Sequence, residues 1–353
     1  MKLLPAILIL GLATCSHADE VASRIVGYNV VDCPAGSDTI VSVPFHLPAS
    51  FSGAVNGTPS ANGSEVTITP KASPTFAANE FTTEAHYVQF VGAGARAGWT
   101  FAVSSHTASS ITIDAGSEDL SDLADGDRFE VIPHWTLATL FPQATQTALH
   151  QSDSKLSTGR KSRILFFDET TAGISLAPDR VYFLTADGWF QSTAGLPAAD
   201  DVVVPPGKAF VIRHPATETA TEFIPHQVVV ESSWSAPLEV RAAGRQDNAV
   251  ALVRPIPVKL SDLGLGAAFE ESADNAGPNR ADELLVYDNL QAAVNKAPSK
   301  VYFRAAGEWR LDDGSTYPPA DDHEVLPSTG LVVRKAAGAS DDTLRWLNTP
   351  TYQ

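Results

Sequence analysis

Two pairs of adjacent aspartates are the clearest candidates for chemistry in this 353-residue sequence. Asp200-Asp201 and Asp321-Asp322 recur in similar surroundings, and His323 follows the second pair. Carboxylate oxygens are the ligands that Ca²⁺ prefers, so these four aspartates are candidate calcium ligands and calcium is the candidate cofactor. The alternative is that they form turns. Neighbouring residues of a strand point to opposite faces, and aspartates in turns often accept hydrogen bonds from backbone amides.

Tryptophan is the second candidate for chemistry. The sequence has 6, and Trp189 and Trp309 are the pair at matching positions of a repeated segment. An exposed indole can stack on a sugar ring, whereas a buried one fills a core. Trp189 and Trp309 are therefore candidate ligand-stacking residues, although their repetition favours a role in a shared core. The solvent exposure of the tryptophans decides between the two.

Signatures of common enzyme classes are missing from the sequence. It contains no H-E-x-x-H, C-x-x-C or G-x-S-x-G pattern and no P-loop. Gly92 to Ala97 fits G-x-G-x-x-A, but a strand-like segment follows where a dinucleotide site needs a helix, which predicts a hairpin loop. We therefore assign no catalytic or cofactor-binding residue, and a non-enzyme is favoured.

The first eighteen residues have the pattern of a signal peptide. Lys2 precedes an apolar run over residues 3–12, and Ser16-His17-Ala18 forms a small-x-small cleavage site. The alternative is a lipoprotein signal with Cys15 acylated. The run is shorter than the ~20 residues of a membrane span, so we expect no membrane span. The prediction is export to the periplasm, cell envelope or extracellular space.

Composition predicts an all-β protein. Gly 24, Pro 24 and Met 1 favour many short strands joined by tight turns over long helices. The formal net charge is −17, and no stretch rich in Lys and Arg offsets it, so we expect no nucleic-acid partner. The remaining candidate partners are a second copy of the chain and a cell-surface polysaccharide.

An internal repeat organises the chain. Residues 164–190 match residues 284–310 at 10 of 27 positions, and residues 197–213 match residues 318–334 at 8 of 17. The repeat predicts a duplicated domain of about 120 residues, which is an ordinary domain size. We therefore expect a signal peptide over 1–18, a β domain over 19–128 and two similar β units over 129–248 and 249–353. Thr39 to Phe45 repeats the strand-then-proline pattern with which each unit opens.

Alternating and β-branched segments predict where the strands lie. In the first β domain these are Ile40–Phe45, Glu65–Thr69, Tyr87–Val91, Trp99–Ser104 and Ile111–Asp114. In the first unit, Arg180–Leu184, Asp187-Gly188 and Trp189-Phe190 have the pattern of a hairpin. Helices are expected to be short, with candidates at Asn289–Ala297, Leu137–His150 and Leu260–Glu271. The expected architecture is a tandem of small β-sandwich or barrel domains.

The order of several short motifs resembles an uncharacterised, multi-copy family of exported bacterial β-rich proteins. These motifs are Val43-Pro44-Phe45, Gly98-Trp99-Thr100, Gly126-Asp127, Pro133–Pro142 and Pro205-Pro206-Gly207. The second unit departs from the last of them with Pro327-Ser328-Thr329. The resemblance implies export and a β architecture and carries over no catalytic residue. Three functions are then ranked: a structural or adhesive cell-envelope protein, a carbohydrate-binding module array, and a secreted hydrolase.

Overall fold

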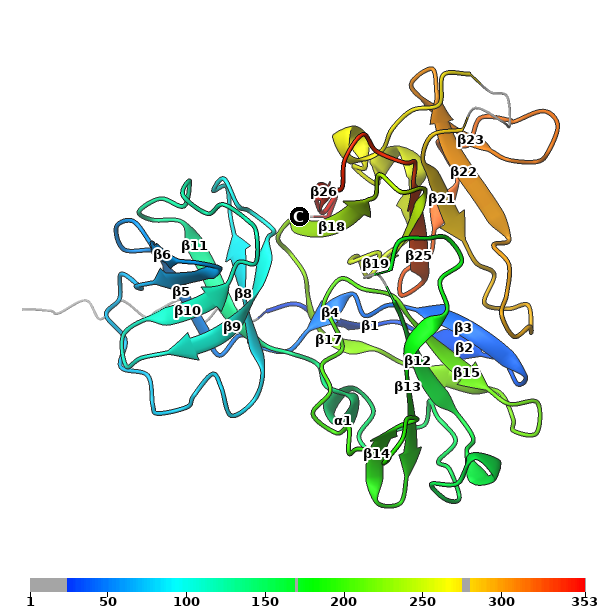
Figure 1. Ribbon diagram of the computed structural model, residues 1–353, viewed down its shortest axis with the longest axis horizontal. Helices are drawn as coiled ribbons and strands as arrows, with labels where there is room; N and C mark the ends of the chain where they lie inside the picture. The colour runs from blue at the N-terminus through cyan, green and yellow to red at the C-terminus, as the bar shows by residue number, and fades with distance from the viewer. Residues whose placement is uncertain (1–23, 169–170, 275–279, 353) are drawn as a thin grey trace, which may run out of the picture.

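A computed structural model describes residues 24–168, 171–274 and 280–352. The predicted signal peptide and Cys15 lie outside the described residues. Strands make up nearly all of the regular structure of these residues, and the single α-helix among them, α1 (Leu137–Leu140), is one turn long. The prediction of an all-β protein is therefore confirmed. Figure 1 shows a barrel at one end of the molecule and two sheet-containing units beside each other at the other end.

The barrel comprises residues 51–133. Its strands are β5 (Phe51–Ala54), β6 (Ser60–Asn62), β7 (Glu65–Ile68), β8 (His86–Val91), β9 (Thr100–His106), β10 (Ile111–Asp114) and β11 (Arg128–Pro133). They pair in the order β5-β11-β8-β9-β10-β7-β6, and a bridge from Val55 to Pro70 joins the ends of β5 and β7. Buried phenylalanines such as Phe90 and Phe129 fill the interior, which closure of the barrel removes from water.

The first unit has a five-stranded sheet. Its order is β3 (Ser37–Val41), β15 (Phe210–His214), β12 (Arg163–Phe167), β13 (Pro178–Thr185) and β14 (Gly188–Gln191). The segments that cover it are β2 (Val31–Cys33), which pairs with β16 (Thr221–Phe223), together with α1, and a 3₁₀ turn, Ser157–Gly159, precedes β12. A separate three-stranded sheet pairs β1 (Val26–Tyr28), β17 (His226–Val229) and β4 (Phe45–His46).

The second unit has a sheet of the same strand order. It runs β19 (Gln246–Ala251), β25 (Gly330–Lys335), β21 (Glu283–Val286), β22 (Lys300–Ala305) and β23 (Glu308–Leu311). β18 (Trp234–Val240) pairs with β26 (Asp342–Asn348), and β20 (Val258–Lys259) pairs with β24 (Glu324–Val325). Two 3₁₀ turns, Leu260–Asp262 and Gly266–Ala268, lie against this sheet.

The two units contact each other through reciprocal, equivalent bonds. Asp38 of β3 donates its amide to the carbonyl of Ala293 (2.8 Å), and Asp247 of β19 donates its amide to the carbonyl of Gly173 (2.9 Å). Bridges from Val41 to Thr329 and from Lys208 to Val250 repeat this exchange. Each unit therefore places a loop on the outermost strand of the other, as two subunits do across a two-fold axis.

The folded units do not follow the divisions expected after residues 128 and 248. Residue 128 opens β11 of the barrel, and residue 248 lies inside β19. The first unit begins with β2 and β3, so the barrel is an insertion between β4 and α1. β3 pairs with β15 across about 170 residues of sequence, as Asp38 opposite Arg213 shows. Such a pairing leaves no mark on local sequence patterns, so local patterns do not reveal where the first unit begins.

The helices expected at Asn289–Ala297, Leu137–His150 and Leu260–Glu271 were wrong or far too long. Residues 289–296 form the loop that docks on β3, where Asn295 has φ of 52° and its amide bonds to the carboxylate of Asp38 (2.7 Å). Contacts with a distant strand therefore override a weak local helix preference. The other two segments keep only single turns.

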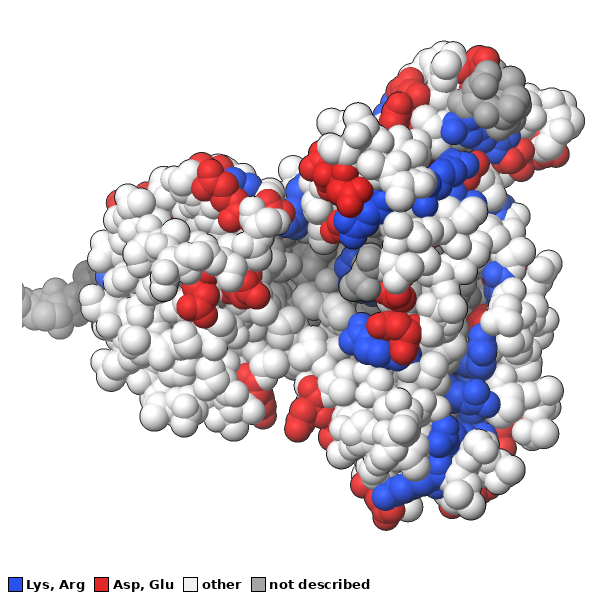
Figure 2. All heavy atoms as spheres, viewed as in Figure 1, with Lys and Arg blue, Asp and Glu red and all other residues white. Residues whose placement is uncertain are grey.

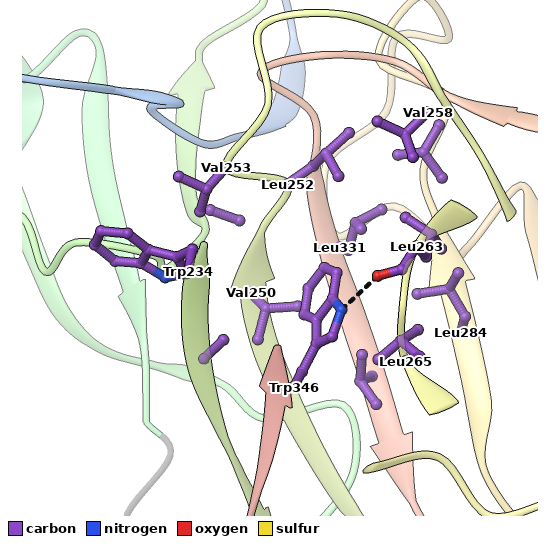
Figure 3. Packing of buried hydrophobic residues seen from close by; sticks show 14 of the residues in the cluster. Trp234, Val250, Leu252, Val253, Val258, Leu263, Leu265, Leu284, Leu331 and Trp346 are labelled. Carbon is purple, nitrogen blue, oxygen red and sulfur yellow. Dashed lines mark hydrogen bonds between the residues drawn. The ribbon is translucent and has the colours of Figure 1, made fainter. Parts of the chain in front are cut away.

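The largest core lies in the second unit and joins it to β18 and β26. Trp346 is buried at its centre among Val250, Leu265 and Leu331, and its indole N–H donates to the carbonyl of Leu263 (2.6 Å) (Figure 3). This bond satisfies the only polar atom of a large buried side chain, which keeps its burial favourable.

Candidate functional site

The predicted aspartate pairs lie in equivalent turns, and the first aspartate of each pair binds the backbone. Asp200 accepts a hydrogen bond from the amide of Trp189 (3.2 Å), and Asp321 accepts one from the amide of Trp309 (3.0 Å). Asp322 forms an exposed ion pair with Lys259 (2.7 Å). Within the described residues, no group of three or more His, Cys, Asp or Glu side chains is placed to hold a metal ion. The geometry is that of a turn cap.

The structure contradicts a stacking role for Trp189 and Trp309. Their exposed fractions are 1% and 4%, so neither ring face is open to a ligand. Trp189 packs against Phe141, and Trp309 packs against Phe269, at ring-centroid distances of 6.0 and 4.9 Å. Their equivalent positions therefore serve the cores of the two units.

The other tryptophans provide no open platform either. Trp234 and Trp346 are buried. Trp99 is half-buried and carries two guanidinium groups on its ring, from Arg96 at 4.2 Å and Arg345 at 4.0 Å. Trp135 is half-buried, and its indole donates to the carbonyl of Phe45 (3.1 Å). Sugar recognition by a row of tryptophans, which the carbohydrate-binding alternative required, has no support in this arrangement.

A buried serine–histidine pair in the first unit was not expected from the sequence. The His214 ring bonds to the Ser162 hydroxyl (2.8 Å) and to the Thr221 hydroxyl (2.8 Å). Burial, with a smaller contribution from His150, lowers the pKa of His214 to about 4. His214 and Ser162 are 0% and 2% exposed, so no substrate reaches the hydroxyl. The pair is structural, and it is formed by residues 52 positions apart with no motif between them.

The second unit fills the same place with a buried ion pair. Lys335 and Asp282 stand where His214 and Ser162 stand in the first unit, and Lys335 donates both to Asp282 and to the carbonyl of Ala268 (2.7 Å). The two units therefore fill equivalent buried positions with different side chains, a Ser–His pair in the first and a Lys–Asp ion pair in the second. Such a replacement is tolerated because each polar group keeps a partner.

An open cleft of 540 Å³ lies between the barrel and the two units. Its lining includes Arg24, Arg128, Glu130 and Glu231. Arg24 holds the carboxylate of Glu130 through two hydrogen bonds of 2.5 and 3.0 Å, so that carboxylate is not available as a base. Among the described residues, none that lines the cleft is Trp, Tyr or Phe. The cleft is a polar hollow without a stacking surface.

Strand β1 is the most exposed apolar element. It forms the outer edge of the β1-β17-β4 sheet, and Val26 and Tyr28 are 67% and 70% exposed. Ile25, Val30 and Ile224 extend the surface, with exposed fractions of 57%, 52% and 41%. We call these five residues the β1 edge. Sequence patterns predict no strand here, because residues 25–30 are only a short mixed segment.

The backbone of β1 also presents unused pairing groups. The carbonyl of Ile25 accepts from Val229, and the amide of Asn29 donates to Pro225, so these residues face β17. Alternation along a strand then directs the amide and carbonyl groups of Val26 and Tyr28 away from β17. The β1 edge thus combines apolar side chains with a strand edge open to further pairing.

No helix in the described parts of the chain has the length and apolar character needed to cross a membrane. No protein-family model, no curated protein and no solved structure matches this chain.

Proposed function

We propose that this protein is an exported, non-catalytic structural or adhesive protein of the cell envelope that self-associates through the β1 edge. The observation that carries the proposal is the exposure of Val26 and Tyr28, at 67% and 70%, on an edge strand without a charged residue. Soluble monomers usually protect an edge strand with charge, proline, a covering segment or short length, and of these β1 has only its length of three residues. A second copy of β1 would bury the apolar side chains and form hydrogen bonds with the outward backbone groups.

The alternatives receive less support. The buried tryptophans remove the stacking platform on which a carbohydrate-binding array of the predicted kind depends. A hydrolase needs an accessible nucleophile with a base and an orienting group, and the Ser162–His214 pair is closed to solvent. The same proposal includes three further points. The protein is exported, it is related to the multi-copy exported proteins that it resembles, and its two units arose by duplication. The equal strand order and reciprocal contacts of the two units support the duplication.

Light scattering over a range of concentrations tests this function. We expect the chain beginning at Asp19 to form dimers or larger assemblies, and Tyr28→Lys to reduce them by placing a charge on the shared edge. Leu156→Lys is the matched control, because Leu156 is 71% exposed and lies outside the β1 edge. A monomer at all concentrations, or equal assembly by both variants, would contradict the proposal.

A further inference from the structure

Basic side chains form a row across the outer face of the first unit. Arg163 of β12 lies directly opposite Arg213 of β15, so both side chains stand on the same face. Arg160 lies over the ring of Phe183 at 4.3 Å, on the next strand of the sheet. We call Arg160, Arg163 and Arg213 the arginine row. Figure 2 shows a continuous blue band over this unit, although the protein as a whole is strongly acidic.

Arg163, at the centre of the row, is unpaired. It makes no hydrogen bond or ion pair with any described residue, and its Nε is buried without a partner. Arg213 is bonded to Asp38, and Arg160 donates to the Ser192 hydroxyl (2.5 Å) and to the carbonyl of Lys155. Burial, followed by the charges of Arg213 and Arg160, lowers the pKa of Arg163. Like charges directly opposite on a sheet destabilise it, and Asp38 neutralises Arg213 but not Arg163, so an anion at Arg163 would stabilise this face.

The second unit provides an internal comparison, because its equivalent face is charge-balanced. Glu283 stands where Arg163 stands, and it lies 3.3 Å from Arg245 and 3.6 Å from Arg334. Arg280 lies over Phe303 at 4.3 Å, as Arg160 does over Phe183, but it forms an ion pair with Asp312. The first unit has Ser192 at the position that corresponds to Asp312.

The differences between the faces are therefore specific. The ion pair of Arg213 with Asp38 is kept in the second unit as Arg334 with Asp247. The two acidic residues that neutralise the second face, Glu283 and Asp312, are replaced by Arg163 and Ser192 in the first. The fold therefore does not require the extra positive charge, because the same framework exists without it.

We propose that the arginine row binds the carboxylate or sulfate groups of an acidic polysaccharide. A guanidinium group presents a planar fork of donors that matches such oxyanions. Arg163 and Arg213 stand on neighbouring strands, which lie about 4.8 Å apart, and Arg160 extends the row over Phe183, so the three charges suit an extended polymer with regularly spaced anions. This site lies apart from the β1 edge and goes beyond the proposed function, because self-association does not require it.

Titration of the protein with polysaccharides tests the site. The probes are polygalacturonate (carboxylate), chondroitin sulfate (carboxylate and sulfate) and dextran (neutral), with inorganic sulfate as the free ion. We expect saturable binding of at least one acidic polymer, weakening with added salt, and none of dextran. Arg163→Glu and Ser192→Asp reproduce the charges of the second unit and should each weaken binding at least tenfold.

The control matches the charge change at another place. Arg241→Glu alters net charge as Arg163→Glu does, but Arg241 lies in the second unit beside Glu239. It should change affinity less than twofold. If Arg163→Glu is unstable, Arg163→Gln removes the charge with less change in shape, and melting temperatures identify any unfolding.

Several results would overturn the site. These are equal losses in the Arg163 and Arg241 variants, binding of dextran, binding of inorganic sulfate without either acidic polymer, and equally tight, Arg163-dependent binding of a DNA duplex. A transfer experiment adds a positive test. Glu283→Arg combined with Asp312→Ser should create a second binding site, and an unchanged stoichiometry in the folded double variant would also count against the proposal.

Discussion

Asp38 and Arg213 form a two-point ion pair across strands β3 and β15, with donor–acceptor distances of 2.5 and 2.7 Å. Asp247 and Arg334 form the equivalent ion pair across β19 and β25, at 2.7 and 3.0 Å. Each aspartate also accepts an amide from the loop of the opposite unit, from Asn295 and Ser175 respectively, both at 2.7 Å. One carboxylate in each unit thus links two strands and the neighbouring unit.

Asp38→Ala should destabilise the protein by about 3 kcal/mol, the usual cost of breaking a buried ion pair and leaving its partner uncompensated. Asp38 is 5% exposed, so water cannot replace it. Urea unfolding measures the change. Asp187→Ala is the control, because the ion pair of Asp187 with Lys155 is exposed and should contribute little. Equal effects of the two substitutions would show that the buried link is not important.

Acid should destabilise the first unit through His214. Its pKa of about 4 in the folded protein lies below the ~6.5 of an unfolded histidine, so the unfolded chain binds more protons between these values. Stability from the neutral ring is complete above pH 6.5 and is lost as pH falls toward 4. The loss between pH 7 and pH 5 should be about 2 kcal/mol.

The matched variant for this effect is His214→Gln, because glutamine keeps a polar side chain but binds no proton between pH 5 and pH 7. Urea unfolding of the variant at pH 7 and pH 5 should show a smaller loss than the wild type by about that amount. His134, whose pKa burial also lowers to about 4, contributes to both proteins alike. An identical pH dependence in the two proteins would refute the assignment.

The aspartate turns should stabilise the protein without calcium. Asp200→Ala and Asp321→Ala each remove an acceptor for a tryptophan amide, and each should cost about 1 kcal/mol, as the loss of a capping bond does. Thermal unfolding with calcium and with a chelator should give the same melting temperature. A calcium-dependent rise that Asp200→Ala abolishes would restore the metal hypothesis.

Gly207→Ala should disturb the junction between the units. Gly207 has φ of +73°, and a Cβ there would lie 2.5 Å from the indole Nε1 of Trp234. We expect a loss of more than about 2 kcal/mol and a change in tryptophan fluorescence. Ser328, the counterpart of Gly207 in the second unit, has φ of 58°. Ser328→Gly should therefore be tolerated, and a greater loss there than at Gly207 would contradict the argument.

Local patterns in the sequence predicted several strands well, because those strands carry their own signal. Glu65–Thr69, Tyr87–Val91 and Ile111–Asp114 coincide with β7, β8 and β10 to within one or two residues. The Gly92–Ala97 segment forms the predicted loop between β8 and β9, which pair. Turn residues and alternation specify such features within a few positions.

Features formed by distant residues could not be predicted in this way. The placement of β3 beside β15 depends on a pairing that spans the whole inserted barrel. Ser162 and His214 meet without a shared motif, and the arginine row combines Arg160 from the segment before β12, Arg163 from β12 and the distant Arg213 from β15. The low overall density of Lys and Arg hides that row, because Arg213 joins Arg160 and Arg163 only when the sheet has formed.

Hydrogen–deuterium exchange of the β1 amides tests self-association through the β1 edge most directly. The amides of Val26 and Tyr28 face away from β17, so only a further strand can protect them. We predict that their exchange slows as protein concentration rises and that Tyr28→Lys abolishes the slowing, while amides of the barrel strand β9 show no change. Assembly that leaves the exchange of Val26 and Tyr28 unaltered would contradict the account.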